Sequence, residues 1–148
     1  KSEALPISSG NEIIRTVSAI NGSDPCVVAV DEAFMIEGSG EAMIWLFRNG
    51  HTVLVSSLQL SSDGSAYPET QLMFPYATHV EVCPAVDPIS KKDAYYTEKY
   101  AGRKDHAIEV GGAEMYRPRD WSGFFESMLH EEYEDFREEK DTDEMEIS

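Results

Sequence analysis

The sequence predicts an α/β fold in which two parallel strands are connected by a helix. Residues 26–30 and 52–58 are apolar runs without alternation, a pattern typical of strands that are covered on both faces of a parallel sheet. Between them, residues 41–48 carry apolar side chains at helical spacing and end at Asn49 and Gly50. A strand, a helix and a second strand within about 30 residues indicate a βαβ unit.

The segments around this unit are predicted from the same kinds of pattern. Residues 13–20 have the apolar spacing of an amphipathic helix, and polar residues break it at 21–25. Residues 72–77 contain Pro75, so we expect only a short turn there. Residues 79–82 alternate between polar and apolar side chains and predict a strand.

The last third of the chain predicts a small lobe and a helix. Residues 87–92 are expected to form a polar turn, and residues 94–100 and 107–110 a β-hairpin. Asp120 is a candidate N-cap for an amphipathic helix. The apolar face of that helix consists of Trp121, Phe124, Phe125, Met128, Leu129 and Phe136. We therefore expect three parts: an α/β core over 1–82, a lobe over 83–120, and a helix with an acidic tail over 121–148.

Composition excludes several classes of partner. The 148 residues include 12 basic and 28 acidic side chains, a net charge of −16, so nucleic acid and anionic lipid surfaces are not expected to bind. No apolar run approaches the roughly 18–20 residues of a membrane span. Two cysteines, Cys26 and Cys83, indicate a reducing compartment, and we expect a cytoplasmic protein.

Both ends of the sequence carry further expectations. The chain opens with Lys1 rather than Met, which favours a processed chain or part of a longer one. The C-terminal residues are strongly acidic. They are interpreted as a solubilising tail, with mimicry of nucleic acid for a basic partner as the alternative.

The pair Asp31-Glu32 is the strongest candidate for chemistry. An acidic pair directly after a hydrophobic strand resembles the end of a Walker B strand, where carboxylates assist Mg²⁺ and accept a proton. Acidic residues also begin loops without any catalytic role. The phosphate-binding loop (P-loop) that usually accompanies such a strand needs a Gly-Lys pair, and this sequence has none.

Five short motifs in register resemble the type II (cellular and phage-type) thymidine kinase family. Residues 30–34 (V-D-E-A-F) are similar to its D-E-A-Q-F segment, and residues 110–116 (V-G-G-A-E-M-Y) to its I-G-G-x-x-x-Y. Residues 4–9, 58–67 and 94–97 match three further segments in the same order. This resemblance implies a P-loop-kinase-like sheet that here is only partial, and a β-hairpin or lasso lobe.

The resemblance also implies ATP- and Mg²⁺-dependent transfer of the γ-phosphoryl group to the 5′-hydroxyl of thymidine. Glu32 would be the general base, and Asp31 would assist Mg²⁺ through water. The residues implied to bind thymidine are Phe34, Tyr67, Thr97, Val110, Gly111, Gly112 and Tyr116. Tetramers are implied as well, and a host cytoplasm if the protein is viral.

The sequence also departs from the family pattern. The family holds its lasso with a zinc ion, and the corresponding positions here are Asp87, Ser90, Asp120 and Gly123. Since a structural zinc site needs four good nitrogen or sulfur ligands, we predict no zinc. Ser61 and Ser62 replace an Asp-Phe pair, so we expect weaker binding of thymidine.

Three functional hypotheses follow. The first is part of a thymidine kinase, active only if a P-loop segment is supplied by the same protein or by a second chain. The second is a catalytically inactive domain derived from such a kinase and used for oligomerisation or assembly. The third is a nucleoside-binding regulator without turnover. The C-terminal helix could pack on the sheet or on another subunit, and the sequence leaves both open.

Overall fold

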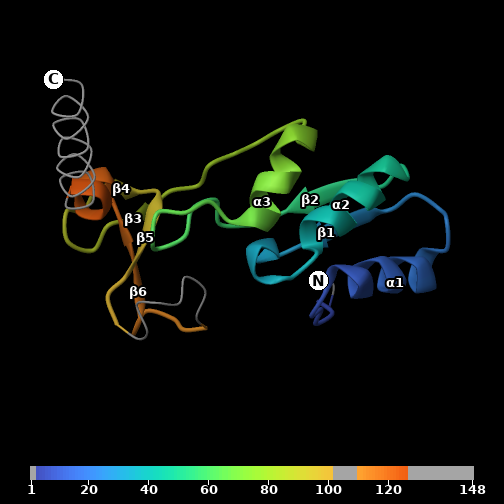
Figure 1. Cartoon of the computed structure of the whole chain (residues 1–148), viewed down its shortest axis with the longest axis horizontal. Coiled ribbons are helices and arrows are strands. Elements are labelled where there is room, and N and C mark those ends of the chain that lie inside the picture. Colours follow the sequence, from blue (N-terminus) through green and yellow to red (C-terminus); the bar gives the residue numbers. More distant parts are fainter. Residues whose placement is uncertain (1–2, 102–109, 127–148) are drawn as a thin grey trace, which may run out of the picture. The chain divides into compact units, whose positions relative to one another are not determined.

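The computed structural model describes residues 3–101 and 110–126 of the chain (Figure 1). The chain divides into two compact units, residues 1–81 and residues 82–148. The first contains a parallel sheet with helices and the second contains antiparallel hairpins, and each unit is considered by itself.

The first unit is the predicted βαβ arrangement with additional helices. Its strands β1 (Val27–Val30) and β2 (Thr52–Val55) are parallel, in a register that runs from Val27 opposite Thr52 to Val30 opposite Val55. The helices are α1 (Gly10–Asn21), α2 (Ser39–Arg48) and α3 (Pro68–Met73), with the 3₁₀ turns η1 (Ala33–Met35) and η2 (Phe74–Tyr76). The α/β fold class and the predicted helices over 13–20 and 41–48 are confirmed.

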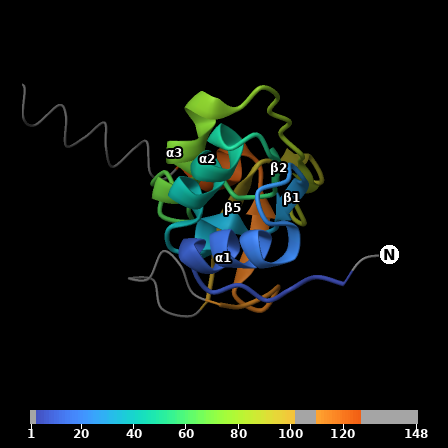
Figure 2. The same ribbon diagram turned by 90° about the vertical axis from the view of Figure 1, so that its right-hand side faces the viewer.

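The core of this unit lies where α1 and α2 meet the sheet. Its buried residues are Ile13, Val28, Ala42, Met43 and Leu46. Helix α2 contacts both α1 and α3 (Figure 2). Burial of each large apolar side chain contributes about 1.5–3 kcal/mol, so α2 is the main source of stability in this unit.

Helix α1 begins at a capping box. The Ser9 side chain accepts the backbone N–H of Glu12, and the Glu12 carboxylate accepts both the backbone N–H and the hydroxyl of Ser8. This exchange satisfies backbone donors that a helix start otherwise leaves without partners. The hydrogen bonds to Ser8 lower the pKa of Glu12.

Only one face of the two-stranded sheet is covered. Val28 is buried, and Val30 and Val53 pack against the same core. On the opposite face Val27 is 64% exposed and Leu54 is 56% exposed. The prediction that both strands are buried on both faces was therefore wrong. The reason is that side chains alternate across a strand, and the core helices contact one of the two sets.

The segment after β2 differs from the prediction in two places. Residues 68–76 form α3 and η2 rather than a short turn, because each proline lies in the first turn of its helix, where no backbone N–H is needed. Residues 79–82, predicted as a strand, are not assigned to one. Alternation is insufficient there because a strand also needs a neighbour to hydrogen-bond with.

The second unit contains two short antiparallel pairs. Strand β3 (Ala85–Val86) pairs with β4 (Asp93–Ala94), and the predicted polar turn over 87–92 connects them. Strand β5 (Tyr96–Lys99) pairs with β6 (Tyr116–Arg119). A hairpin is thus present, and among the described residues β5 pairs with 116–119. The predicted partner over 107–110 lies, apart from Val110, outside the described part of the chain.

A helix begins after Asp120, as predicted, and residues 121–126 are helical. The Asp120 side chain accepts the backbone N–H of Gly123 at 2.8 Å. The Phe124 ring stacks on Tyr96, with 5.3 Å between ring centroids, and Phe125 meets both rings edge-on. The remaining residues of the predicted apolar face, Met128, Leu129 and Phe136, lie outside the described residues. Within those residues no helix is long and apolar enough to cross a membrane.

Candidate functional site

The loop after β1 carries the acidic pair. Asp31 and Glu32 are both exposed, and the Asp31 carboxylate accepts the backbone N–H of Glu32 at 3.0 Å. Glu32 has φ 52° and ψ 42°, in the left-handed region that residues other than glycine rarely adopt. Such a conformation costs of order 1–3 kcal/mol and is frequent at functional sites.

This loop is fixed to its surroundings directly after Glu32. The backbone N–H of Ala33 donates to the carbonyl of Ser56 at the end of β2, at 3.2 Å. The hydroxyl of Ser39, in the first turn of α2, donates to the Ala33 carbonyl at 2.6 Å. Ala33 and Ser39 are both fully buried. The backbone that carries Glu32 is therefore held by β2 and by α2.

Two of the predicted substrate-binding residues meet in this unit. The rings of Phe34 and Tyr67 have centroids 4.7 Å apart and are tilted by 42°. Tyr67 is buried, and Phe34 is half-buried in η1, two residues after Glu32. The structure therefore groups Asp31, Glu32, Phe34 and Tyr67 around the carboxyl end of β1.

A cavity of about 840 Å³ lies along β2 within the first unit. Its polar lining includes Asp31, Ser56, Ser57, Gln59 and Thr70, which lie at or beyond the carboxyl ends of the two strands or on α3. Ligands of parallel sheets bind at such strand ends, and the volume is in the usual range for ligand pockets. Glu32, Phe34 and Tyr67 do not contribute to its walls.

The sequence analysis missed two buried polar residues at this cavity. The Thr70 hydroxyl donates to the Leu58 carbonyl at 2.8 Å and lies 2.7 Å from the Ser57 hydroxyl. His51 is 7% exposed, and its Nδ1 accepts the backbone N–H of Cys26 at 3.1 Å. Neither residue belongs to a motif, and only contacts between distant segments reveal them.

The other predicted thymidine-binding residues lie in the second unit. Thr97 is on β5 opposite Pro118, and Tyr116 is on β6 opposite Lys99. Val110, Gly111 and Gly112 precede β6 and are exposed. The Gly112 carbonyl accepts the backbone N–H groups of both Met115 and Tyr116 at 3.0 Å. These residues therefore share one hairpin and the loop that leads into it.

Three of the four positions that the resemblance aligns with zinc ligands, Asp87, Ser90 and Asp120, meet at one carboxylate, and the backbone N–H of the fourth, Gly123, donates to Asp120. Asp87 is fully buried. Its Oδ1 accepts the backbone N–H groups of Ile89 and Ser90, at 2.8 and 3.1 Å. Its Oδ2 accepts the backbone N–H of Asp120 at 2.8 Å and Nε of Arg119 at 3.0 Å. One side chain thus connects the 87–92 turn, β6 and the start of the last helix.

The charges of this cluster shift its pKa values. Burial raises the pKa of Asp87, but hydrogen bonds from the backbone and from Arg119 outweigh burial and hold this pKa far below its usual range. Arg119 also donates to Glu98 at 3.2 Å, and Arg117 forms a second ion pair with Glu98. These guanidinium groups lower the pKa of Glu98 against the opposing effect of burial. The cluster is fully ionised at neutral pH.

These residues do not fit a zinc ion. Both Asp87 oxygens are engaged by N–H donors, the Arg119 guanidinium repels a cation, and neither Ser90 nor Gly123 provides a nitrogen or sulfur side-chain ligand. In residues 3–101 and 110–126 no group of three or more His, Cys, Asp or Glu side chains is arranged to hold a metal. The absence of zinc from the protein stays a prediction.

Comparison with known families gives one match. The family model described as thymidine kinase matches residues 2–120, which is most of the chain. No curated protein matches the sequence. The matched range includes both groups of candidate residues, from Asp31 to Tyr116, together with the Asp87 cluster.

Proposed function

The chain belongs to the thymidine kinase family, and on that premise we propose that it is the nucleoside-binding and proton-accepting part of a thymidine kinase. The reaction is transfer of the γ-phosphoryl group of ATP to the 5′-hydroxyl of thymidine. The observation that carries this proposal is the acidic pair, retained on a loop that β2 and α2 fix at the carboxyl end of β1.

In this proposal Glu32 accepts the proton of the 5′-hydroxyl as that oxygen attacks phosphorus. A general base must lie within hydrogen-bond reach of the proton that it removes. The exposed carboxylate and its constrained backbone support this role. Bound ATP and Mg²⁺ would supply the phosphoryl group and neutralise its charge, with Asp31 assisting the metal through water.

Candidate contacts to thymidine are proposed in each unit separately. Phe34, supported by the buried ring of Tyr67, offers an aromatic surface to the base. Thr97, Val110, Gly111, Gly112 and Tyr116 would read the edge of the base with backbone and side-chain groups. Ser61 is buried and its hydroxyl bonds the carboxylate of Asp63, which makes it part of a turn and not a base contact.

The proposed reaction also requires a segment that binds the phosphates of ATP. No Gly-Lys pair occurs in the sequence, so we propose that the P-loop comes from another part of the same protein or from a second chain. The exposed apolar side chains of Val27 and Leu54 support this addition, because parallel sheets are usually covered on both faces.

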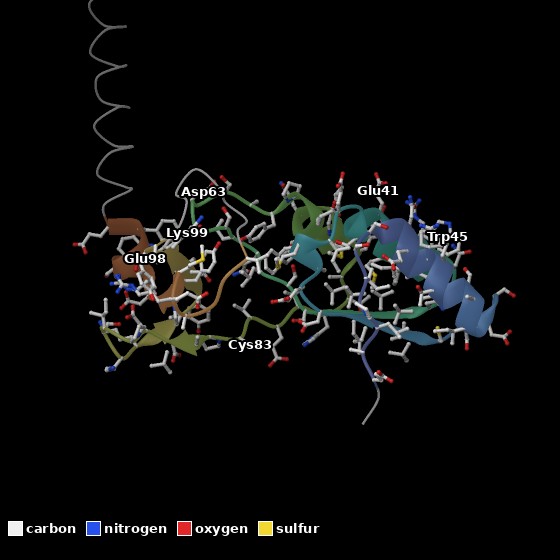
Figure 3. All side chains as sticks on the ribbon, turned by 90° about the horizontal axis from the view of Figure 1, so that it is seen from below. Glu41, Trp45, Asp63, Cys83, Glu98 and Lys99 are labelled. Atoms are coloured by element: carbon white, nitrogen blue, oxygen red, sulfur yellow. The ribbon has the colours of Figure 1, made fainter. Side chains whose placement is uncertain are left out.

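The first experiment compares the chain alone with the chain joined to the reading frame that precedes it in its gene. We expect thymidine phosphorylation only from the longer protein. In that protein Glu32→Gln should lower kcat by about 10²–10⁴-fold, the usual contribution of a general base. Glu41→Gln is the matched control, since Glu41 is an exposed glutamate in the first turn of α2 (Figure 3).

Two results would contradict the proposal. Equal turnover in the Glu32→Gln and Glu41→Gln proteins would remove Glu32 from the reaction. A folded longer protein that contains a P-loop and still does not phosphorylate thymidine would favour the alternative, a catalytically inactive domain used for assembly. The mass in solution, measured by light scattering, would then test the oligomer that this alternative requires.

A further inference from the structure

A carboxylate from α3 holds the N-terminal end of α2. The Glu69 side chain accepts the backbone N–H of Gly38 on Oε1 at 2.9 Å and that of Gly40 on Oε2 at 2.6 Å. These N–H groups belong to the first turn of α2, where a helix has no internal acceptors and its dipole favours negative charge. Gly38, the N-cap residue of α2, has no side chain with which to cap the helix itself.

The contact is close enough to restrict the sequence at Gly40. A Cβ atom at this position would lie 2.8 Å from Oε2 and 2.9 Å from the backbone carbonyl oxygen of Glu69. Any larger residue would therefore displace the carboxylate or the start of α3. Gly40 allows α2 and α3 to approach until one carboxylate reaches two backbone groups.

The end of the Asp31–Gly38 loop is also fixed from the side of α1. The backbone N–H of Gly10 donates to the Glu37 carbonyl at 2.8 Å. A Cβ at Gly10 would lie 2.0 Å from the carbonyl oxygen of Gly38. The loop that begins with the acidic pair thus ends between α1 and the Glu69 carboxylate.

We propose that Glu69 is a positioning residue for this loop, an inference that rests on the proposed function of Glu32. Tyr67 lies two residues before Glu69, at the N-cap of α3, and its ring supports Phe34. By fixing α3 to the start of α2, Glu69 sets both the backbone path from Asp31 to Gly38 and the position of the ring beneath Phe34. Glu69 itself touches no reacting atom.

The experiment removes the carboxylate and measures the loop directly. In the Glu69→Ala protein we expect faster hydrogen exchange at the Gly38 and Gly40 amides, which lose their acceptor, and also at the Ala33 amide, which Glu69 does not contact. Glu41→Ala is the control. It removes a carboxylate that belongs to the first turn of α2 itself, and it should leave exchange at the Gly38, Gly40 and Ala33 amides unchanged. An unchanged Ala33 amide in the Glu69→Ala protein would overturn the proposal.

Rescue by small anions separates positioning from a general loss of stability. Formate or acetate fits the space that the removed carboxylate leaves and can accept the same two N–H groups. Either ion should restore slow exchange at Ala33, whereas chloride at equal ionic strength should not. Glu69→Gln, which keeps the shape and one acceptor oxygen, should give an intermediate result, and it serves as the test if the alanine protein does not fold.

Steady-state kinetics of the longer protein, which contains the P-loop, provide a second test of the role of Glu69. There Glu69→Ala should lower kcat by about 10–100-fold, with formate restoring part of it and the KM for ATP unchanged. If kcat is unchanged while exchange at Ala33 rises, the positioning role is overturned. If the unmodified protein has no kinase activity, the proposed function fails, and the exchange data still decide whether Glu69 positions the loop.

Discussion

The two units of this protein are stabilised by different means. In the first, aliphatic side chains from α1, β1 and α2 form the core. In the second, the carboxylate of Asp87 is fully buried and accepts four hydrogen bonds, three from backbone N–H groups and one from the Arg119 guanidinium. No other fully buried side chain among the described residues has as many. In the same unit, the aromatic rings of Tyr96, Phe124 and Phe125 pack against one another.

This difference shows how a small lobe can be held by an internal ion pair where its family pattern has a metal. Breaking a buried ion pair is costly because the remaining charge has no partner, and an aliphatic core loses stability gradually with each methyl group removed. The first unit should therefore tolerate conservative changes, and the second should depend sharply on the charge state of Asp87.

The largest expected effect is on the first unit, from Leu46→Ala. Leu46 is fully buried, so the change should lower the free energy of unfolding by about 2–5 kcal/mol, through lost burial and the cavity left behind. Trp45 reports on this unit by fluorescence during urea unfolding once Trp121, the other tryptophan, is changed to Phe. Ile20→Ala, at an exposed position, should stay within about 0.5 kcal/mol. Similar losses from both would contradict a core centred on α2.

The second expected effect is a dependence on pH that is greatest in the second unit. The pKa of Asp87 is lowered by folding, so its stabilising contribution is complete above the ordinary aspartate pKa of about 3.9 and is lost as the pH falls below it. The lowered pKa values of Glu98 and Asp120 act in the same direction. The protection factor of the Ile89 and Asp120 amides, which is the ratio of the intrinsic to the observed exchange rate, should therefore be high and constant above about pH 4 and fall below it.

Asp87→Asn tests this assignment. The asparagine keeps the size of the side chain but cannot form the ion pair with Arg119, so the protection factors of the same two amides should be lower by about tenfold or more at pH 7 and nearly independent of pH in acid. Amides of α2 should be unaffected. If the Asp87→Asn protein kept the acid dependence of the unmodified chain, another group would have to be responsible.

The smallest expected effect is at the start of α1. Ser9→Ala removes the acceptor for the Glu12 N–H and should lower the free energy of unfolding of the first unit by about 1 kcal/mol. Ser18→Ala, at an exposed position inside the same helix, should be neutral or slightly stabilising, since alanine is the better helix former. Equal losses from the two would mean that Ser9 contributes only helix propensity. Circular dichroism during thermal unfolding measures both.

Sequence patterns were most reliable where a single element carries its own signal. The apolar spacing around Ile13 and the candidate N-cap Asp120 predicted helices that the structure contains. The same reasoning failed for residues 79–82, whose alternation is that of a strand, since pairing depends on a neighbour that a local pattern does not specify. The pairing of β5 with residues 116–119 was also not foreseen, because only the tertiary structure brings those residues beside β5.

Some residues of the candidate site could be identified from the sequence, and others could not. The acidic pair after β1 was identifiable because it directly follows an apolar run, and the resemblance to a family suggested Glu32 and Phe34. Glu69 gave no such signal, since a glutamate in the first turn of a helix is ordinary and its acceptor role concerns a different helix, about 30 residues away.

By itself, the sequence determined the order and type of most elements, the N-cap at Asp120 and the location of the acidic pair, because these depend on neighbours within a few positions along the chain. Only the tertiary structure decided which face of the sheet is covered, which carboxylate holds the start of α2, and that Asp87 lies at the centre of an ionic cluster. Those features arise from contacts between residues about 30 positions apart, whose distances follow from the packing of whole helices and strands.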